Sequence, residues 1–328
     1  MEQSFEARVY LGSLVADAYS MPVHWYYNTQ ALDRDYPELL KAENYLSPEN
    51  PHPDSILWRS VYQPLAPEAD ILHSQAQYWG QHGIHYHQFL KAGQNTVNYQ
   101  LARELYQQVL EFREYDAERW LKHYVSCMRQ PGWHGDTYVE EYHRAFFNRL
   151  ASGVKLMKCG INDKHIGGLS QVPALYAALR EVEVTRPESI RSIVQEHIGL
   201  THQNQSVLQA GDILVRLLES LRAGQDLESA IEQEANNAVS IKRFYDWQNK
   251  PDREVVGKLL SSACYIEDSF PASLYLAWKY RNDLMAGVRA NALVGGDNCH
   301  RGAVVGSLLG STDSIPAGWL EPLIAVQV

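Results

Sequence analysis

Apolar side chains recur every three or four residues along most of this chain, and that spacing restricts the fold more than any other feature of the sequence. In residues 98–112, Leu101 and Leu105 lie on one apolar stripe of the expected helix. Residues 206–224 repeat the pattern, and Gly224 is the predicted end of that helix. Strict alternation of apolar and polar residues, which would indicate strands, is scarce.

Further helices are predicted for residues 186–202, 226–239 and 253–266. We therefore predict an all-α fold, a compact multi-helix bundle. Residues 44–70 are rich in proline and should form an irregular excursion. Because the helices on both sides of this excursion need each other for burial, we expect residues 1–328 to form a single domain.

Charge and composition exclude some classes of partner. The 328 residues carry a formal net charge of -10 and contain no cluster of lysine and arginine, which argues against nucleic acid and anionic membranes. No stretch approaches the ~20 apolar residues of a membrane span. We expect a small-molecule or modified-protein substrate, no nucleic acid and no membrane partner. The oligomeric state is not indicated.

The cysteines and the start of the chain indicate a compartment. Cys127, Cys159, Cys264 and Cys299 are far apart and form no CxxC motif, so reduced thiols are the simpler expectation. The first residues are acidic where a signal peptide needs a basic flank, and Asp17 interrupts their apolar run. The expected location is the cytoplasm.

Residues 294–310, VGGDNCHRGAVVGSLLG, contain the clearest candidate site. Two glycines precede five hydrogen-bonding side chains, Asp297 to Arg301, and small apolar residues follow at once. This order is typical of a loop that delivers side chains into a site at the start of a helix. We expect a binding or catalytic function for this stretch.

Other loops carry weaker candidates. Asp136, Glu140 and His143 are spaced as one face of a helix would be, although such a face is more often a solvated one. His85 and His87 have a spacing that suits metal ligation from a strand or loop, but surface histidines have it more often.

Two further loops hold polar residues near predicted helix ends. Asp163 and His165 precede a double glycine, where simple turn chemistry is the alternative to a site. His202 lies in the segment GLTH at a predicted helix start, where it could equally be a packing residue.

Six segments, in chain order, resemble the motifs of the ADP-ribosylglycohydrolase superfamily. They are GSLVADAYSMPVHW, NTVNYQLAREL, GLTH, FPASLYLAWKY, VGGDNCHRGAVVGSLLG and IPAGWLEPL. The NCHRG variant is most similar to the branch that includes the jellyfish lens crystallins. The resemblance implies an all-α domain with a central cleft that holds two Mg²⁺ or Mn²⁺ ions. Those ions would hold ribose hydroxyls and activate the water that breaks the bond to an ADP-ribose acceptor such as arginine or serine.

Transferred position by position, this resemblance implies that most metal ligands have been replaced. The family's metal-binding positions fall on His24, Thr96, Val97, Asn98, Asp297, Cys299 and His300. Among these residues only Asp297 retains a carboxylate, and a single carboxylate cannot neutralise two divalent ions. We expect no paired magnesium and no required cofactor.

Three hypotheses remain for the altered cleft. The first is a hydrolase of a glycosidic bond, ADP-ribosyl or nucleoside-like, with catalytic Asp297, Cys299, His300 and His24, in which a neighbouring imidazole activates the Cys299 thiol. The second is a single Zn²⁺ held by Cys299 with one or both of His24 and His300. The third is a non-catalytic ligand-binding or crystallin-like structural protein. The expected substrate-binding residues are Thr96, Asn98, Asp136, Asp163, His165, His202, Asn298 and Arg301.

Overall fold

A computed structural model of the chain describes residues 3–323, and in this range it is helical without any β-strand. The α-helices are α1 (Phe5–Ser20), α2 (Thr29–Asp35), α3 (Val97–Phe112), α4 (Ala117–Arg129), α5 (Glu141–Ala151), α6 (Val172–Glu181), α7 (Pro187–Gly199), α8 (Gln205–Arg222), α9 (Leu227–Glu234), α10 (Ile241–Trp247), α11 (Asp252–Glu254), α12 (Ile266–Lys279), α13 (Leu284–Leu293), α14 (Asn298–Thr312) and α15 (Ala317–Leu320). Short 3₁₀ turns connect several of them, at Met21–Val23, Pro37–Leu40, Leu57–Arg59, Pro67–Ala69, His73–Tyr78, Leu156–Lys158 and Ile166–Leu169. The predicted all-α fold is confirmed.

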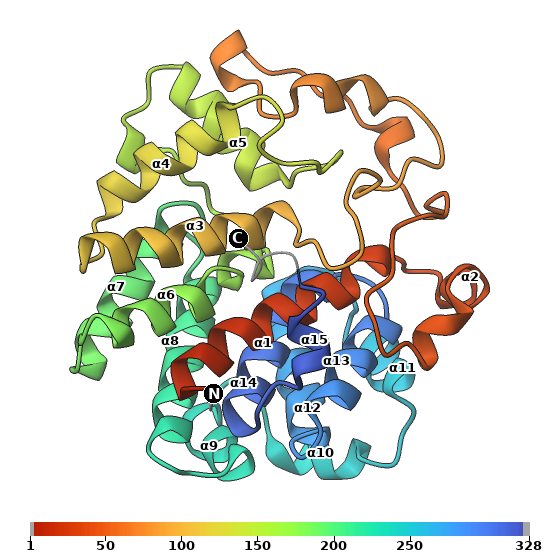
Figure 1. Cartoon of the computed structure of the whole chain (residues 1–328), viewed down its shortest axis with the longest axis vertical. Coiled ribbons are helices and arrows are strands. Elements are labelled where there is room, and N and C mark those ends of the chain that lie inside the picture. The colour runs from red at the N-terminus through yellow and green to blue at the C-terminus, as the bar shows by residue number, and fades with distance from the viewer. Residues whose placement is uncertain (1–2, 324–328) are drawn as a thin grey trace.

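The centre of the fold is the pair formed by α1 and α14, the first and the penultimate helix (Figure 1). Almost every side chain of α14 is buried, because α1, α8, α12 and α13 surround it. Its small residues allow this: a Cβ on Gly306 would lie 2.2 Å from the carbonyl oxygen of Gly12 on α1. The two backbones therefore touch without intervening side chains.

The helical periodicity placed most elements correctly. The stripe expected in residues 98–112 is the buried face of α3, where Leu101, Leu105 and Val109 are at most 1% exposed. Helix α8 ends at Arg222, and Gly224 follows with the positive φ of +92° that terminates helices.

The helix predicted for residues 253–266 is wrong. Helix α11 ends at Glu254, a single π turn follows at Val255–Leu259, and the chain is then irregular up to α12. Gly257 has a φ of +131°, a conformation that a helix cannot contain. The irregular backbone instead brings the Ser262 carbonyl beside the start of α14.

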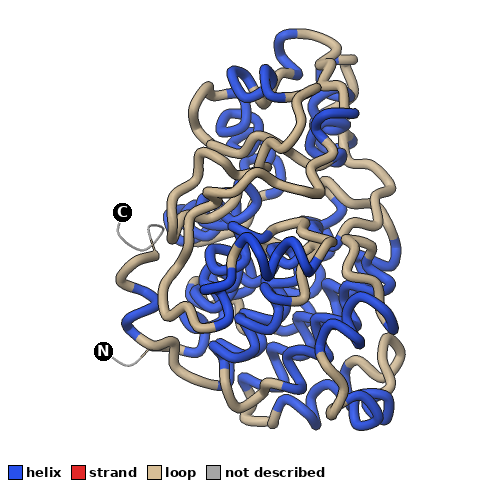
Figure 2. The backbone as a smooth tube through the Cα atoms, turned by 90° about the vertical axis from the view of Figure 1, so that its right-hand side faces the viewer, coloured by secondary structure: helices blue, strands red, loops and turns tan. Residues whose placement is uncertain are grey.

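Apart from the short 3₁₀ turns at Leu57–Arg59 and Pro67–Ala69, the proline-rich residues 44–70 are irregular. Loops, drawn in tan, are prominent in the upper half of the view in Figure 2, whereas helices fill most of the lower half. The ring of His52 is buried and its Nε2 lies 2.8 Å from the carbonyl oxygen of His24. The hydroxyl of Tyr45 donates to the carbonyl oxygen of Trp319, 2.8 Å away. This excursion therefore holds the segment that follows α1.

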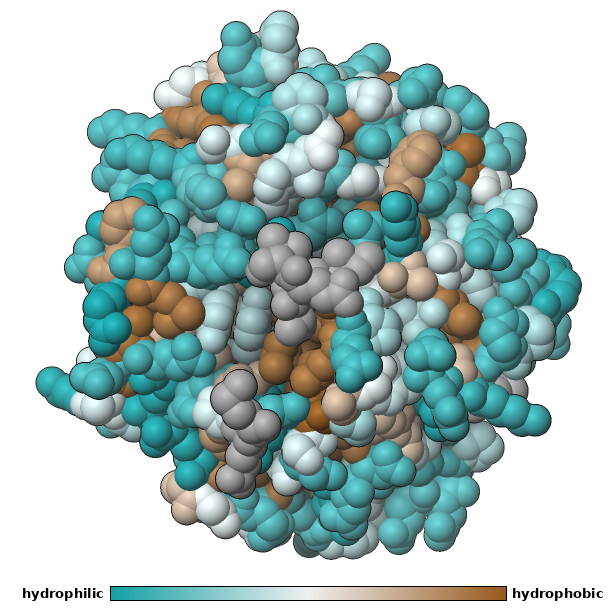
Figure 3. Space-filling view, viewed as in Figure 1, coloured by the Kyte–Doolittle hydropathy of each residue, from teal (hydrophilic) through white to brown (hydrophobic). Residues whose placement is uncertain are grey.

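The face of the molecule in Figure 3 is largely hydrophilic, with small separate apolar areas. Among the described residues, no helix is both long enough and apolar enough to cross a membrane.

Candidate functional site

The site is built around the start of α14. Asp297 precedes the first residue of this helix and follows Gly295 and Gly296, which both have a positive φ. A Cβ on Gly296 would lie 2.1 Å from the Ser262 carbonyl oxygen, so only glycine fits there. The Gly296 carbonyl also accepts a hydrogen bond of 2.8 Å from the Trp25 backbone, which ties the loop to the segment after α1.

His300 lies between two carboxylates. Its Nδ1 is 2.6 Å from Oδ1 of Asp297, one turn earlier, and its Nε2 is 2.9 Å from Oε1 of Glu140. All three side chains are buried, with at most 5% exposed. The spacing of three residues places Asp297 and His300 on the same side of the helix start.

A second chain of contacts reaches Asp297 from the opposite direction. His24 Nε2 lies 2.9 Å from the same Oδ1 of Asp297, and His24 Nδ1 lies 2.8 Å from Nε2 of His87. His87 Nδ1 in turn lies 2.5 Å from Oδ1 of Asp136. Two imidazoles therefore connect two buried carboxylates in a continuous line.

Asn98, at the start of α3, joins Glu140 to a third group of rings. Its Nδ2 donates to Glu140 Oε1 at 2.9 Å, and its Oδ1 accepts from the Tyr142 hydroxyl at 2.8 Å. The same Oδ1 lies 3.0 Å from Nε2 of His143, whose Nδ1 accepts from the Tyr124 hydroxyl at 2.6 Å. These contacts fix the amide orientation of Asn98.

Burial and charge compete at these groups. Burial alone would lower the pKa of His300, but Asp297 and Glu140 raise it to about 10. Burial would raise the pKa of Asp297, yet His300 and His24 hold it well below its usual range. At His24 burial prevails and lowers the pKa to about 3. The two carboxylates therefore favour the protonated form of His300.

Three buried carboxylate oxygens have no hydrogen-bond partner: Asp297 Oδ2, Glu140 Oε2 and Asp136 Oδ2. An unsatisfied buried acceptor destabilises a fold by about 1–3 kcal/mol, and more when it is charged. These oxygens therefore mark places where a bound group or water would be stabilised.

Cys299 is not part of this arrangement, which corrects the expectation of a thiol nucleophile. Its side chain is fully buried, packs with Met21 and Leu90, and lies 3.7 Å from the Asp17 carbonyl oxygen. Burial raises the pKa of the Cys299 thiol well above its usual range. A sealed, protonated thiol is not a nucleophile, and Cys299 equally cannot provide the sulfur of the zinc site considered from the sequence.

Three other candidates hold neighbouring parts of the fold rather than face the site. The Thr96 hydroxyl and backbone N–H both donate to the Asp17 carboxylate, at 2.8 and 2.9 Å. Arg301 is fully buried and donates to the carbonyl oxygens of Ser262 and Gly295. The Asn298 amide donates to backbone carbonyls at 3.1 and 3.2 Å. Their contacts explain the shape of the loop, so direct substrate binding by them is not supported.

His165 lies at the edge of the network. Its Nε2 is 3.7 Å from Asp297 Oδ2, and its backbone N–H donates to Asp163, which is half-buried. His202 is buried, and its ring packs 4.2 Å from that of Tyr142. Only His165 among these three candidates approaches a carboxylate of the network.

Asp136, Glu140 and His143 do converge, but the helical face predicted for them is wrong. Helix α5 begins at Glu141, so Asp136 and Glu140 precede it in irregular backbone. Their carboxylates reach the network from the loop, where Asp136 meets His87 and Glu140 meets His300.

His87 and Tyr142 belong to the network, but the sequence indicated His87 only weakly and did not indicate Tyr142. The spacing of His85 and His87 was the only sequence signal for the first, and it also suits a surface loop. Tyr142 lies in the aromatic-rich start of α5, where nothing in the sequence separates it from a packing residue.

Two magnesium ions do not fit these residues. Val97 and Cys299, which occupy two of the positions transferred from the family, are buried and offer no oxygen ligand. Imidazole nitrogens of His24 and His300 stand where hard cations require oxygen. No step of a reaction can be assigned to a magnesium pair here.

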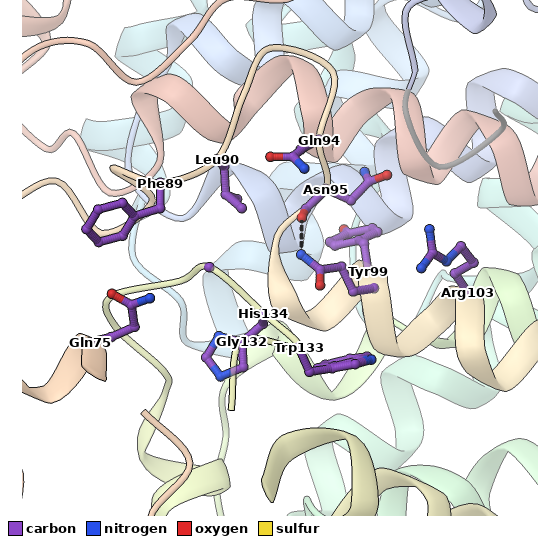
Figure 4. Close-up of a pocket in the computed structure, with 12 residues that line it drawn as sticks. Gln75, Phe89, Leu90, Gln94, Asn95, Tyr99, Arg103, Gly132, Trp133 and His134 are labelled. Carbon is purple, nitrogen blue, oxygen red and sulfur yellow. Dashed lines mark hydrogen bonds between the residues drawn. The ribbon is translucent and has the colours of Figure 1, made fainter. Parts of the chain in front are cut away.

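Two cavities lie beside the network. The larger, of about 520 Å³, is lined by α3 and the 132–135 loop and includes Tyr99, Arg103 and His134 (Figure 4). The smaller, of about 20 Å³, touches Asn98 and Tyr142 directly. Neither cavity is lined by His24, Asp297 or His300.

Comparison with known proteins identifies a family for the fold. The family model described as ADP-ribosylglycohydrolase matches residues 3–327. A solved structure titled "ADP-ribosylglycohydrolase-related protein complex" superimposes with a TM-score of 0.59 at 18% sequence identity, over 98% of this chain and 94% of that one. No curated protein matches the sequence.

Proposed function

Because the chain belongs to the ADP-ribosylglycohydrolase family, we propose that it hydrolyses a glycosidic bond, ADP-ribosyl or nucleoside-like, at a site that operates without the paired magnesium ions. The proposed site consists of Asp297, His300, His24 and Glu140. Asn98, Asp136 and His165 support it.

The observation that carries this proposal is the pair of unpartnered oxygens, Asp297 Oδ2 and Glu140 Oε2. The two carboxylates lie on opposite sides of the His300 ring, since each meets a different ring nitrogen. A pair of carboxyl groups is the usual equipment for breaking a glycosidic bond. Free acceptor positions on both would bind a sugar hydroxyl and a water. One carboxylate would accept the proton of that water as its oxygen bonds to the anomeric carbon, and the same proton would pass to the leaving group as the glycosidic bond breaks.

The side of the site nearest to solvent is that of Asp297 Oδ2. One carboxylate oxygen of Asp297, the Cys264 sulfur and a ring nitrogen of His165 lie within 4.8 Å of one another. Cys264 is half-buried, whereas His24 and His300 are about 1% exposed. We therefore place the approach of the sugar on this side.

The test measures release of ADP-ribose from peptides modified on arginine or serine, and of base from nucleosides. We expect wild-type turnover, and a loss of at least about 10²-fold in D297N and E140Q. D313N removes an exposed carboxylate and serves as the matched control. Turnover that survives in both D297N and E140Q would overturn the assignment of the site.

A second candidate is a non-catalytic ligand-binding or crystallin-like protein. The burial of Asp297 and His300, each at most 1% exposed, favours this alternative, because a closed network can serve stability alone. Absence of turnover with every substrate, together with no shift in melting temperature on addition of ADP-ribose, would select it.

The cytoplasm stays the proposed location. All four cysteines are free, and three of them, Cys127, Cys159 and Cys299, are buried. Free thiols are consistent with a reducing compartment.

A further inference from the structure

We propose that the cavity between α3 and the 132–135 loop binds a neutral sugar, either a monosaccharide or one unit of a longer saccharide. Its volume of about 520 Å³ lies in the range of about 300–1,000 Å³ that is usual for small-molecule sites. Neither Asp297 nor His300 lines this cavity, so the inference does not rest on the proposed function. It adds a second site to the molecule.

Carboxamides and aromatic rings make up much of the cavity lining. The four carboxamides belong to Gln75, Gln94, Asn95 and Gln100. Phe89 and Trp133 add apolar ring surface, and in Figure 4 Trp133 lies across the cavity from Gln94. A carboxamide both donates and accepts hydrogen bonds, as a sugar hydroxyl does, and an aromatic face offers apolar surface to the C–H groups of a sugar ring.

The orientation of the Asn95 amide leaves an acceptor without a donor. Its Nδ2 donates to the carbonyl oxygen of Leu14 and to Oδ2 of Asp17, both at 2.8 Å. Both amide hydrogens are therefore used, and reversing the amide would place its oxygen against two acceptors. Asn95 Oδ1 has no partner, although the residue is only 4% exposed. A ligand hydroxyl would supply the missing donor.

His134 provides a second unsatisfied position in the lining. Its Nε2 lies 2.8 Å from the carbonyl oxygen of Ile71, which can only accept a hydrogen bond. Its Nδ1 has no partner, since Asp136 Oδ2 is 4.0 Å away, beyond hydrogen-bond distance. The residue is 6% exposed. A hydroxyl suits this nitrogen in either protonation state of the ring, because a hydroxyl can donate or accept.

The charge of the lining favours a neutral ligand. Among the described residues that line the cavity there is no carboxylate, which disfavours a cation. Arg103 lines it, but Nη2 of this residue lies 3.7 Å from Oε1 of Glu104, so a neighbouring carboxylate offsets its charge. The Arg103 Nε–H has no acceptor. A sugar can accept from Arg103 and donate to Asn95, whereas a simple anion offers acceptors alone.

The experiment titrates the full chain with D-glucose, D-galactose, D-mannose, N-acetyl-D-glucosamine and D-ribose. Saturation-transfer NMR and tryptophan fluorescence follow the binding. We expect saturable binding of at least one of these sugars, with a dissociation constant of about 1 mM. Glycerol at the same concentrations is the control for solute effects, because polyols that are excluded from a protein surface alter stability without occupying a site.

Three variants locate the bound sugar. W133A removes the ring and its N–H, and it should weaken binding at least about 10-fold. R103M retains an apolar stem but loses the donor, and it should weaken binding about 3–10-fold. The control is W58A, because Trp58 is 47% exposed and does not line the cavity, so this variant should bind as wild type does.

Absence of saturable binding by all five sugars would overturn the proposal. Binding that stays unchanged in both W133A and R103M would place the sugar elsewhere and would equally overturn it. A cavity that takes inorganic phosphate and none of the sugars would contradict the class of ligand. The wild-type titration decides the question even if a variant does not fold. Hydrolysis without sugar binding would reject this site and keep the hydrolase.

Discussion

Gly12 and Gly306 face each other where α1 meets α14, so closely that a Cβ on either would lie 2.2 Å from the other's carbonyl oxygen. Helix α1 leads directly to His24, and α14 begins beside Asp297, so this contact sets the distance between the two halves of the site. The small residues of the last motif thus have a structural reason that is independent of chemistry.

Substitution G306A should therefore unfold the protein or destabilise it by at least about 3 kcal/mol, because backbone atoms cannot give way as a flexible side chain can. Denaturant unfolding monitored by circular dichroism measures the loss. The control is G199A, at the end of α7, where the nearest atom to an added Cβ is a leucine methyl 4.0 Å away. Equal stabilities of the two variants would contradict the close packing of α1 and α14.

Substitution C299A tests the correction about the thiol. The side chain fills a small apolar space beside Met21 and Leu90, so its loss should cost about 1–2 kcal/mol and leave any turnover unchanged. In native protein a thiol reagent should modify the half-buried Cys264 before Cys299, as peptide mass mapping would reveal. Rapid native labelling of Cys299, or turnover abolished in C299A at preserved fold, would restore the nucleophile hypothesis.

The fate of Cys299 also illustrates what the sequence could and could not predict. Helical periodicity was sufficient for α3 and α8, because one face of each helix is buried along its whole length. In the row that begins with Asp297, however, adjacent letters point in different directions, since each helical residue turns the side chain by about 100°. Asp297 and His300 share a side, whereas Cys299 faces α1.

The remaining part of the site comes from loops far apart in the sequence. His87 meets Asp136 across 49 positions, and Asp297 meets His24 across 273. Single-sequence spacing contains no information about such pairs. The motif resemblance did bring His24 and Asp297 together, because it transfers a whole fold rather than a local pattern.

Asp17 provides a prediction about pH. Burial raises the pKa of this carboxyl group to about 6, although Asn95 and Thr96 donate hydrogen bonds to it. A carboxyl whose pKa is higher in the folded state than in the unfolded state stabilises the fold below about pH 4. That stability is lost as the pH rises through about 6.

In D17N the group cannot ionise, and the Thr96 hydroxyl can rotate to accept from the new amide. The free energy of unfolding of wild type relative to D17N should therefore fall by up to about 3 kcal/mol between pH 4 and pH 7. Urea unfolding of both proteins at each pH measures this difference. Curves that stay parallel across this range would show that Asp17 has the same pKa in both states.

Substitution N98D restores a carboxylate at one position that the family resemblance assigns to metal binding, and here it should be harmful. The Asn98 amide donates to Glu140 Oε1 at 2.9 Å, so an aspartate would place two carboxylate oxygens against each other in a buried site. We expect a loss of about 2–4 kcal/mol at pH 7 that becomes smaller as the pH falls, because protonation restores a donor between the two groups. Denaturant unfolding at several pH values measures it, with the exposed N282D as control. If N98D is as stable as wild type at pH 7, then the Asn98 amide does not donate to Glu140. If Mg²⁺ raises the melting temperature of wild type itself, the magnesium pair must be reconsidered.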